Sequence, residues 1–170
     1  GDYFLLFIAD ENLREFESDE TNNVLARPLR VDGADLIVES VEVPAAADFG
    51  DEISVSWTIR NTGTEAVNAN VLDQIVLSQN AAGTQSPITL LSENAGDLVP
   101  LGPGESYTQT FAATLPLNRS SEAGPFFIVA RTDVGNRAAE QNEDNNTGSA
   151  AIDLALPPLP DIVVSDISIP

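Results

Sequence analysis

The chain has 170 residues, with 27 acidic residues against 7 basic ones, all arginine, and a formal net charge of −20; it contains no histidine, lysine, cysteine or methionine. It therefore lacks the usual general base, Schiff-base amine and thiolate nucleophile, every usual zinc ligand except carboxylates, and any disulfide. The negative charge argues against nucleic acid or an anionic membrane as a partner, since both require a basic patch.

The chain repeats itself. Residues 1–24 align without a gap with residues 124–147, and the segment 35–44 returns at 161–170. The positions shared by the longer repeat are Gly1, Phe4, Asp10, Arg14, Glu17, Glu20, Asn22 and Asn23, matching Gly124, Phe127, Asp133, Arg137, Glu140, Glu143, Asn145 and Asn146. A period of about 125 residues is the size of one domain. The chain is therefore expected to be a segment of a tandem array.

This period predicts three parts. Residues 1–31 would hold the last strands of one module, residues 32–157 a complete module, and residues 158–170 a linker and the first strand of the next. The sequence PPLP at 157–160 predicts a stiff, extended connector. An array joined by such connectors would be a semi-rigid rod.

Alternating apolar and polar residues, as in 53–60, predict strands throughout the complete module. The predicted strands are 36–43, 53–60, 70–78, 89–91, 107–115, 126–131 and 150–156. Seven short strands separated by Gly, Pro and Asn favour an all-β fold, a seven-stranded immunoglobulin-like β-sandwich without an inter-sheet disulfide. Its core is expected to contain Leu36, Val55, Trp57, Ile59, Leu77, Phe111, Phe127 and Val129.

The repeated acidic segment is the first candidate site. Its oxygen-bearing side chains are Asp133, Asn136, Glu140, Glu143, Asp144, Asn145 and Asn146 in one copy, and Asp10, Glu17, Asp19, Glu20, Thr21, Asn22 and Asn23 in the other. Calcium binds six to eight oxygens of this kind in irregular geometry. The alternative is structural: Asp and Asn cap turns, and Arg14 and Arg137 form local salt bridges to Glu17 and Glu140. Both interpretations stay open.

Two further sites can be weighed. Asp32 and Asp35 flank the start of the complete module and Asp161 follows its end, so a cation shared at a module boundary is a second hypothesis. An exposed aromatic platform would favour sugar binding. Trp57 shares its alternation phase with Val55 and Ile59, which predicts that it is buried. In each of the aromatic pairs Tyr3–Phe4 and Phe126–Phe127 the two rings have opposite alternation phases, so one ring of each pair could face outward.

Five segments in order resemble a known family. They are DLIVESVEV (35–43), ISVSWTIRNTGT (53–64), VLDQIVLS (71–78), LGPGESYTQTF (101–111) and GPFFIVARTD (124–133), the last followed by E-x-x-E-x-N-N. Together they resemble the CARDB repeats, the cell-adhesion-related domain found in bacteria. The resemblance covers essentially the whole chain and is closest over residues 1–31. It implies an immunoglobulin-like sandwich, usually in tandem within large secreted or surface-anchored proteins. At 134–141 the customary acidic or aromatic positions are partly alanine, which weakens any transfer of function there.

These observations predict a structural and adhesive module of an extracellular, cell-surface protein, forming a rod or fibre that calcium could stabilise. Expected partners are neighbouring repeats, copies of the chain joined by strand addition, or a surface receptor or glycan; nucleic acid and membrane insertion are not expected. Paired carboxylates alone could hydrolyse glycosides, but they need a cleft, so no enzymatic activity is expected. The alternative is a carbohydrate- or protein-binding accessory module of a larger secreted enzyme.

Overall fold

The computed structural model describes residues 2–12, 14–19, 21–30, 32–118, 120–158 and 160–166. Its strands are β1 (Asp2–Ile8), β2 (Val24–Arg30), β3 (Leu36–Glu42), β4 (Ala46–Asp48), β5 (Glu52–Asn61), β6 (Leu72–Ser78), β7 (Ile88–Asn94), β8 (Ser106–Thr114), β9 (Gly124–Arg131) and β10 (Thr147–Ala155). One turn of 3₁₀ helix, Gly96–Leu98, is the only helical element in these ranges. None of the described residues form a helix that could cross a membrane.

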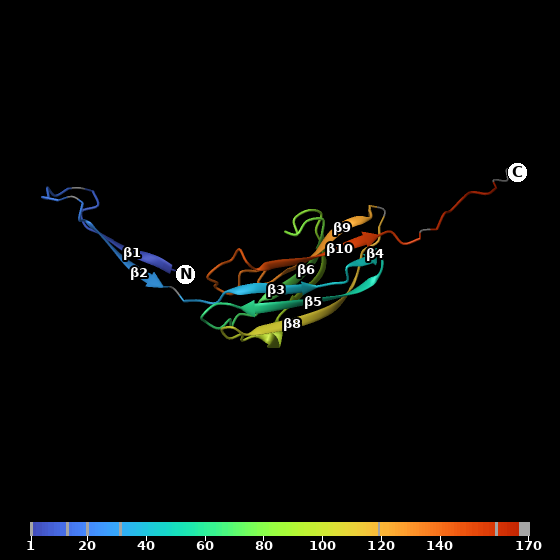
Figure 1. Ribbon diagram of the computed structural model, residues 1–170, viewed down its shortest axis with the longest axis horizontal. Helices are drawn as coiled ribbons and strands as arrows, with labels where there is room; N and C mark the ends of the chain where they lie inside the picture. The colour runs from blue at the N-terminus through green and yellow to red at the C-terminus, as the bar shows by residue number, and fades with distance from the viewer. Residues whose placement is uncertain are drawn as a thin grey trace.

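Strands β3 to β10 form two packed sheets (Figure 1). A five-stranded sheet in the order β4-β10-β9-β6-β7 covers a three-stranded sheet in the order β3-β5-β8. The pairs are antiparallel except for β4, which runs parallel to β10. The chain changes sheets between β3 and β4, at Pro44, which cannot donate a ladder hydrogen bond. The all-β prediction is confirmed, and the two sheets are consistent with an immunoglobulin-like sandwich.

The strand count of the module differs from the prediction. Eight strands form instead of seven, because the three-residue strand β4 is too short to show alternation in the sequence. Strand β7 is longer than the predicted 89–91 and lies at the edge of its sheet, where most of its side chains are exposed. A sparsely buried edge strand carries a weak apolar signal.

The buried side chains include most of the predicted core. Trp57 is 2% exposed, Leu36, Val55 and Ile59 are fully buried, and Leu77 is 1% exposed. Phe111 is partly buried and packs against the same cluster. Trp57 is thus unavailable to a sugar ring, as its alternation phase predicted.

The predicted phase of β9 is wrong. Phe126, Ile128 and Ala130 contact the core, while Phe127 and Val129 point the other way. Val129 is nevertheless fully buried, because the loop at residues 79–86 covers the outer face of the sheet. Every position in the run FFIVA is apolar, so alternation could not identify the face that meets the core.

A buried carboxylate joins the two sheets. Asp73 on β6 is fully buried, and its Oδ2 accepts hydrogen bonds from Trp57 Nε1 at 3.1 Å and Tyr107 OH at 2.8 Å. Its Oδ1 accepts a bond from Thr132 Oγ1 at 2.8 Å. Burial raises the pKa of Asp73, and the three hydrogen bonds oppose that shift. Because Trp57 and Tyr107 belong to the three-stranded sheet, this network links the sheets where a disulfide is impossible.

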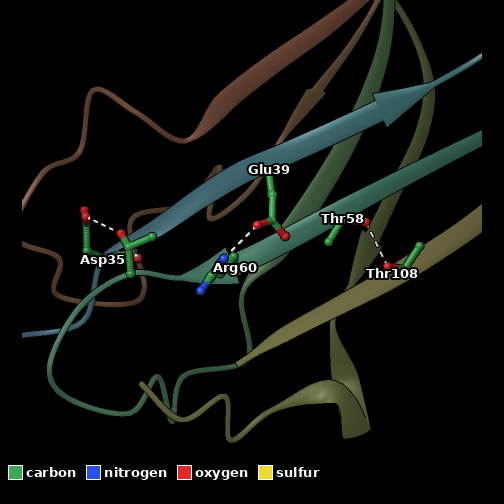
Figure 2. Close-up of polar contacts among 6 residues, drawn as sticks. Asp35, Glu39, Thr58, Arg60 and Thr108 are labelled. Carbon is green, nitrogen blue, oxygen red and sulfur yellow. Dashed lines mark hydrogen bonds and ion pairs between the residues drawn. The ribbon is translucent and has the colours of Figure 1, made fainter. Parts of the chain in front are cut away.

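The outer face of the three-stranded sheet is polar. Figure 2 shows Arg60 Nη1 paired with Glu39 Oε1 at 2.9 Å and the hydroxyls of Thr58 and Thr108 at 2.8 Å. Exposed pairs of this kind contribute about 0–1 kcal/mol each to stability. This face is therefore solvated.

The sandwich has two poles, and the chain enters at one and leaves at the other (Figure 1). We define the N-terminal pole by residues 32–35 and the loops 61–71, 95–105 and 132–146, and the C-terminal pole by the segments 43–51, 79–87, 115–123 and 156–158. Strands β1 and β2 form a separate hairpin apart from the sandwich. Residues 160–166 form no strand, and the last four residues of the strand predicted at 161–170 lie outside the described residues.

Candidate functional site

The loop between β9 and β10 is shaped by its own Asp and Asn side chains. Asp133 and Asn136 both have φ of 45°, a left-handed conformation that these residue types tolerate. The carboxylate of Asp133, only 1% exposed, accepts hydrogen bonds from the backbone N–H groups of Arg137 and Ala138, both at 2.9 Å. Asp133 therefore caps the turn, as the structural interpretation of this segment expects.

The guanidinium of Arg137 bonds to residues outside its own loop. Its Nη1 donates to the carbonyl of Asn70 and to Oδ1 of Asn94, both at 3.0 Å. The arginine thus ties this loop to the loop 61–71 and to the last residue of β7.

The second half of the loop binds the start of the module. Glu140 Oε2 accepts the backbone N–H of Leu36 at 2.6 Å. Gln141 donates its backbone N–H to the carbonyl of Ala34 at 2.8 Å and its side-chain amide to the carbonyl of Gly33 at 2.9 Å. These contacts fix the direction in which the incoming chain meets β3.

Asp35 takes part in the same set of contacts, so residues from both cation hypotheses lie at the N-terminal pole. Its Oδ1 accepts Asn145 Nδ2 at 3.1 Å and its Oδ2 accepts Thr62 Oγ1 at 2.7 Å; Figure 2 shows Asp35 at the start of β3. Both carboxylate oxygens of Asp35 are therefore engaged within the module. Asp161 is exposed and belongs to the segment 160–166, which lies beyond the opposite pole (Figure 1).

Two further residues of this pole were not predicted from the sequence. Asn61 is fully buried and makes four hydrogen bonds: its Oδ1 accepts the N–H groups of Asp35 and Gly63, and its Nδ2 donates to the carbonyls of Glu65 and Leu101. Gly63 lies against the backbone of residues 33–35, where a Cβ would come within 2.6 Å of the Ala34 carbonyl carbon. The sequence did hold a signal for these two residues, the segment NTG at 61–63, directly after the strand predicted at 53–60.

Three carboxylates of the loop converge beside these contacts. One oxygen each from Asp133, Glu140 and Glu143 lies within 4.8 Å of the other two. Burial raises the pKa of Glu140 to about 7, and the neighbouring carboxylates of Glu143 and Asp133 add to that shift. Hydrogen bonds from the Leu36 N–H and from Asn146 oppose it.

An unpaired amide oxygen accompanies the three carboxylates. Asn146 is 8% exposed and its Nδ2 donates to Glu140 Oε1 at 3.0 Å, while its Oδ1 has no hydrogen-bond partner. The Oδ1 of Asn145 is also unpaired. Buried polar oxygens normally have a partner. Unpaired oxygens beside carboxylates therefore indicate a cation that these oxygen atoms can coordinate. Within the described residues, no other three acidic side chains approach one another this closely.

The upstream copy of the loop reproduces the cap of the β9–β10 loop. Asp10 has φ of 39°, and its carboxylate accepts the N–H groups of Arg14 at 2.8 Å and Glu15 at 2.9 Å. Glu17 and Asn22 are exposed, and Glu20 lies outside the described residues. Of the sequence-predicted ligands, the structure brings together Asp133, Glu140, Glu143 and Asn146. Asn145 bonds to Asp35, and Asn136 lies in the exposed turn.

A separate hollow lies at the C-terminal pole. A cavity of about 370 Å³ is lined by apolar side chains such as Phe49, Leu77 and Phe126 and by polar residues that include Gln79 and Ser121. The rings of Phe49 and Phe126 pack edge to face with centroids 5.5 Å apart. This cavity is the ligand-sized feature that the accessory-module alternative requires.

The comparisons with known proteins decide the family. A family model of the CARDB domain matches residues 33–150, which is more than half of the chain. This chain belongs to the CARDB family. The matched range covers β3 to the start of β10 and contains the N-terminal pole except Asp32. The resemblance drawn from the five sequence segments is confirmed.

Solved CARDB domains share the fold. The crystal structure of the CARDB domain of the PF1109 protein from Pyrococcus furiosus, in complex with di-metal ions, is 21% identical, covers 76% of this chain and 100% of that domain, and has a TM-score of 0.56. The solution structure of the same domain is 20% identical, covers 75% of this chain and 100% of that domain, and has a TM-score of 0.56. A domain from Methanosarcina acetivorans, described as part of a cell surface protein, is 21% identical and has a TM-score of 0.51. The match covers 72% of this chain and 92% of that domain. At the level of sequence, no curated protein matches.

Proposed function

We propose that this CARDB chain is a structural and adhesive repeat module of a large extracellular protein, acting as a semi-rigid spacer in a rod or fibre. The observation that carries the proposal is the bonding of residues 33–36 by the loop 132–146, which fixes how the incoming chain meets the sandwich. The chain leaves at the opposite pole through a segment with three prolines between residues 157 and 160. Modules connected in this way would lie end to end.

Scattering from a protein with residues 32–160 twice in succession tests the spacer function. We expect small-angle X-ray scattering to give a maximum dimension close to twice that of one copy, because the prolines restrict bending. Replacing Pro157 and Pro158 by glycine would broaden the distance distribution. A compact particle with side-by-side modules, unchanged by the glycine variant, would rule out a stiff spacer.

We further propose that Asp133, Glu140, Glu143 and Asn146 hold a divalent cation, calcium, at the N-terminal pole. Carboxylate and amide oxygens are the ligands that calcium prefers, and its irregular coordination suits a loop. A cation would relieve the repulsion among three carboxylates that lie within 4.8 Å. The related Pyrococcus domain, which was crystallised in complex with di-metal ions, supports a metal site in this chain. Because Glu140 also bonds Leu36, the ion would stiffen the point where the chain enters the module.

Thermal unfolding of the 170-residue chain in chelator, in millimolar calcium and in magnesium tests the cation site. Extracellular calcium modules have dissociation constants of about 10⁻⁴–10⁻³ M. A tenfold excess of calcium over the dissociation constant would add roughly 1.4 kcal/mol, a rise of several degrees in Tm. We expect Glu143→Gln to abolish the rise.

Asp144→Asn is the matched control for this experiment. It removes the same charge from the adjacent, exposed residue, which is not one of the three convergent carboxylates. The calcium-induced rise should persist in this variant. Equal responses of the two variants, or no rise in the unmodified chain, would contradict the cation site. The Asp and Asn side chains of the loop would then only stabilise turns, and the module would be a spacer without a bound cation.

The accessory-module alternative rests on the cavity at the C-terminal pole. Its wall includes Ile88, which is 40% exposed at the start of the edge strand β7. Saturable binding of a soluble glycan or peptide that is lost in Ile88→Asp would favour this alternative. An inert cavity favours the spacer.

A further inference from the structure

The β1–β2 hairpin reproduces the β9–β10 hairpin residue by residue, with each number increased by 123. The register is the same: Ile8 pairs with Val24 as Arg131 pairs with Thr147. The bond that closes the first turn is the same, since Ala9 N donates to Asn23 O as Thr132 N donates to Asn146 O, each at 2.9 Å. The aspartate cap that follows is also shared.

The equivalent positions differ completely in burial. On the face of β9 and β10 that meets the core, Ile128 and Ala130 are fully buried and Ile152 is 1% exposed. Their counterparts Leu5, Phe7 and Leu29 are 50%, 53% and 46% exposed. The hairpin therefore presents to solvent the side chains that, in the complete module, lie between the two sheets.

The opposite face of the hairpin is apolar as well. Phe4, Leu6 and Ile8 are 69%, 54% and 52% exposed. In the complete module the corresponding outer face is covered by residues 79–86, which Arg131 Nη2 holds through the carbonyls of Ala82 at 3.0 Å and Gly83 at 2.7 Å. A strand that is apolar on both faces is typical of a position buried on both sides of a sheet.

We propose that the hairpin is the last pair of strands of a second CARDB sandwich, and that strands equivalent to β3 to β8 of a neighbouring module cover both of its faces. This inference rests on the array proposed above. A second copy of the chain does not supply the cover, because its own β3 to β8 are already paired within its sandwich. The required partner is a segment of the same kind as residues 36–123, joined to the hairpin where Gly124 begins β9.

A chimera tests the proposal. Residues 32–123 of this chain are placed directly before Gly1, so that the hairpin takes the place of β9 and β10 behind a second set of β3 to β8. We expect amide hydrogen exchange in residues 2–8 and 24–30 to slow at least about tenfold relative to the 170-residue chain. We also expect binding of the apolar dye ANS to fall. The unaltered module 32–157 in the same protein reports that folding is intact, and calcium stabilisation of that module is a separate readout of the proposed cation site.

Two variants of the chimera give matched controls. Leu5→Asp places a charge at the position of Ile128 and should restore fast exchange. Phe16→Asp makes the same kind of change at a fully exposed loop residue and should leave the protection intact. Unprotected hairpin amides in the chimera, or equal behaviour of the two variants, would overturn the proposal. So would dimerisation of the 170-residue chain that Leu5→Asp abolishes, because the cover would then be a second copy.

Discussion

Asp73→Ala is expected to lower the free energy of unfolding by about 3–5 kcal/mol, because it leaves three buried donors without an acceptor. These donors are Trp57 Nε1, Tyr107 OH and Thr132 Oγ1; the first two come from the three-stranded sheet, and Thr132 directly follows β9 of the five-stranded sheet. A loss of that size is a large share of the roughly 5–15 kcal/mol that stabilises an ordinary domain. Urea unfolding followed by Trp57 fluorescence measures it directly. A loss below about 1 kcal/mol would mean that the network does not hold the sheets together.

Asp73→Asn is the conservative control for this network. The amide keeps an oxygen that can accept from Trp57 and Tyr107, and its NH₂ can donate to the hydroxyl of Thr132. We expect this variant to retain most of the stability that Asp73→Ala loses. If the two variants were equally unstable, the geometry of the carboxylate, and not its capacity to accept hydrogen bonds, would be the cause.

The same pair of proteins carries a pH dependence whose sign follows from burial. The pKa of Asp73 is raised above its ordinary value of 3.8, so the folded chain holds this proton more tightly than the unfolded chain. The contribution is complete below the ordinary pKa and is lost as pH rises through the raised folded value. Asparagine does not titrate. The stability advantage of the unmodified chain over Asp73→Asn should therefore shrink as pH increases above about 4.

Gly63→Ala is expected to be the most damaging change at the N-terminal pole. A methyl group there would lie within 2.6 Å of both the Ala34 carbonyl carbon and the Asp35 nitrogen, and these backbone atoms cannot rotate away. The loop would have to move, breaking the bonds of Asn61 to residues 35 and 63. We expect a loss of about 3 kcal/mol or more, comparable to other changes that break a buried network.

Gly135→Ala provides the comparison for this experiment. Its nearest neighbours are atoms of the Arg137 side chain at 3.6 Å, an ordinary contact with a flexible group. We expect a change within about 0.5 kcal/mol. Thermal unfolding gives the global effect, and hydrogen exchange at the amides of Leu36 and Gln141 reports the pole itself. Retention of slow exchange at both amides in Gly63→Ala would contradict the close approach described here.

Much of the sandwich could be predicted because local pattern and tertiary environment agree. In β5, strict alternation places Val55, Trp57 and Ile59 on one face, and the structure buries all three. In β9 every residue from Phe126 to Ala130 is apolar, and the distinction between the two faces depends on a loop about 40 to 50 residues away in sequence. Sequence alternation carries no information about such a cover.

The candidate site was predictable in composition but not in arrangement. The repeat drew attention to Asp133, Glu140 and Glu143, and these three do converge. The contacts of Glu140 and Gln141 with residues 33–36 join segments more than a hundred residues apart, which spacing alone cannot reveal. Asp73, within the apolar segment VLDQIVL, is a polar interruption whose three partners become evident only when the sheets are packed.

The central claim is that the loop 132–146 holds a cation at the point where the chain enters the module. The most direct test is a crystal structure of the 170-residue chain grown with calcium, together with anomalous diffraction from crystals containing manganese in its place. We predict one peak of density bounded by Asp133, Glu140 and Glu143, with the side-chain oxygen of Asn146 turned toward it. Crystals at saturating cation concentration with no density among these three carboxylates would contradict the account.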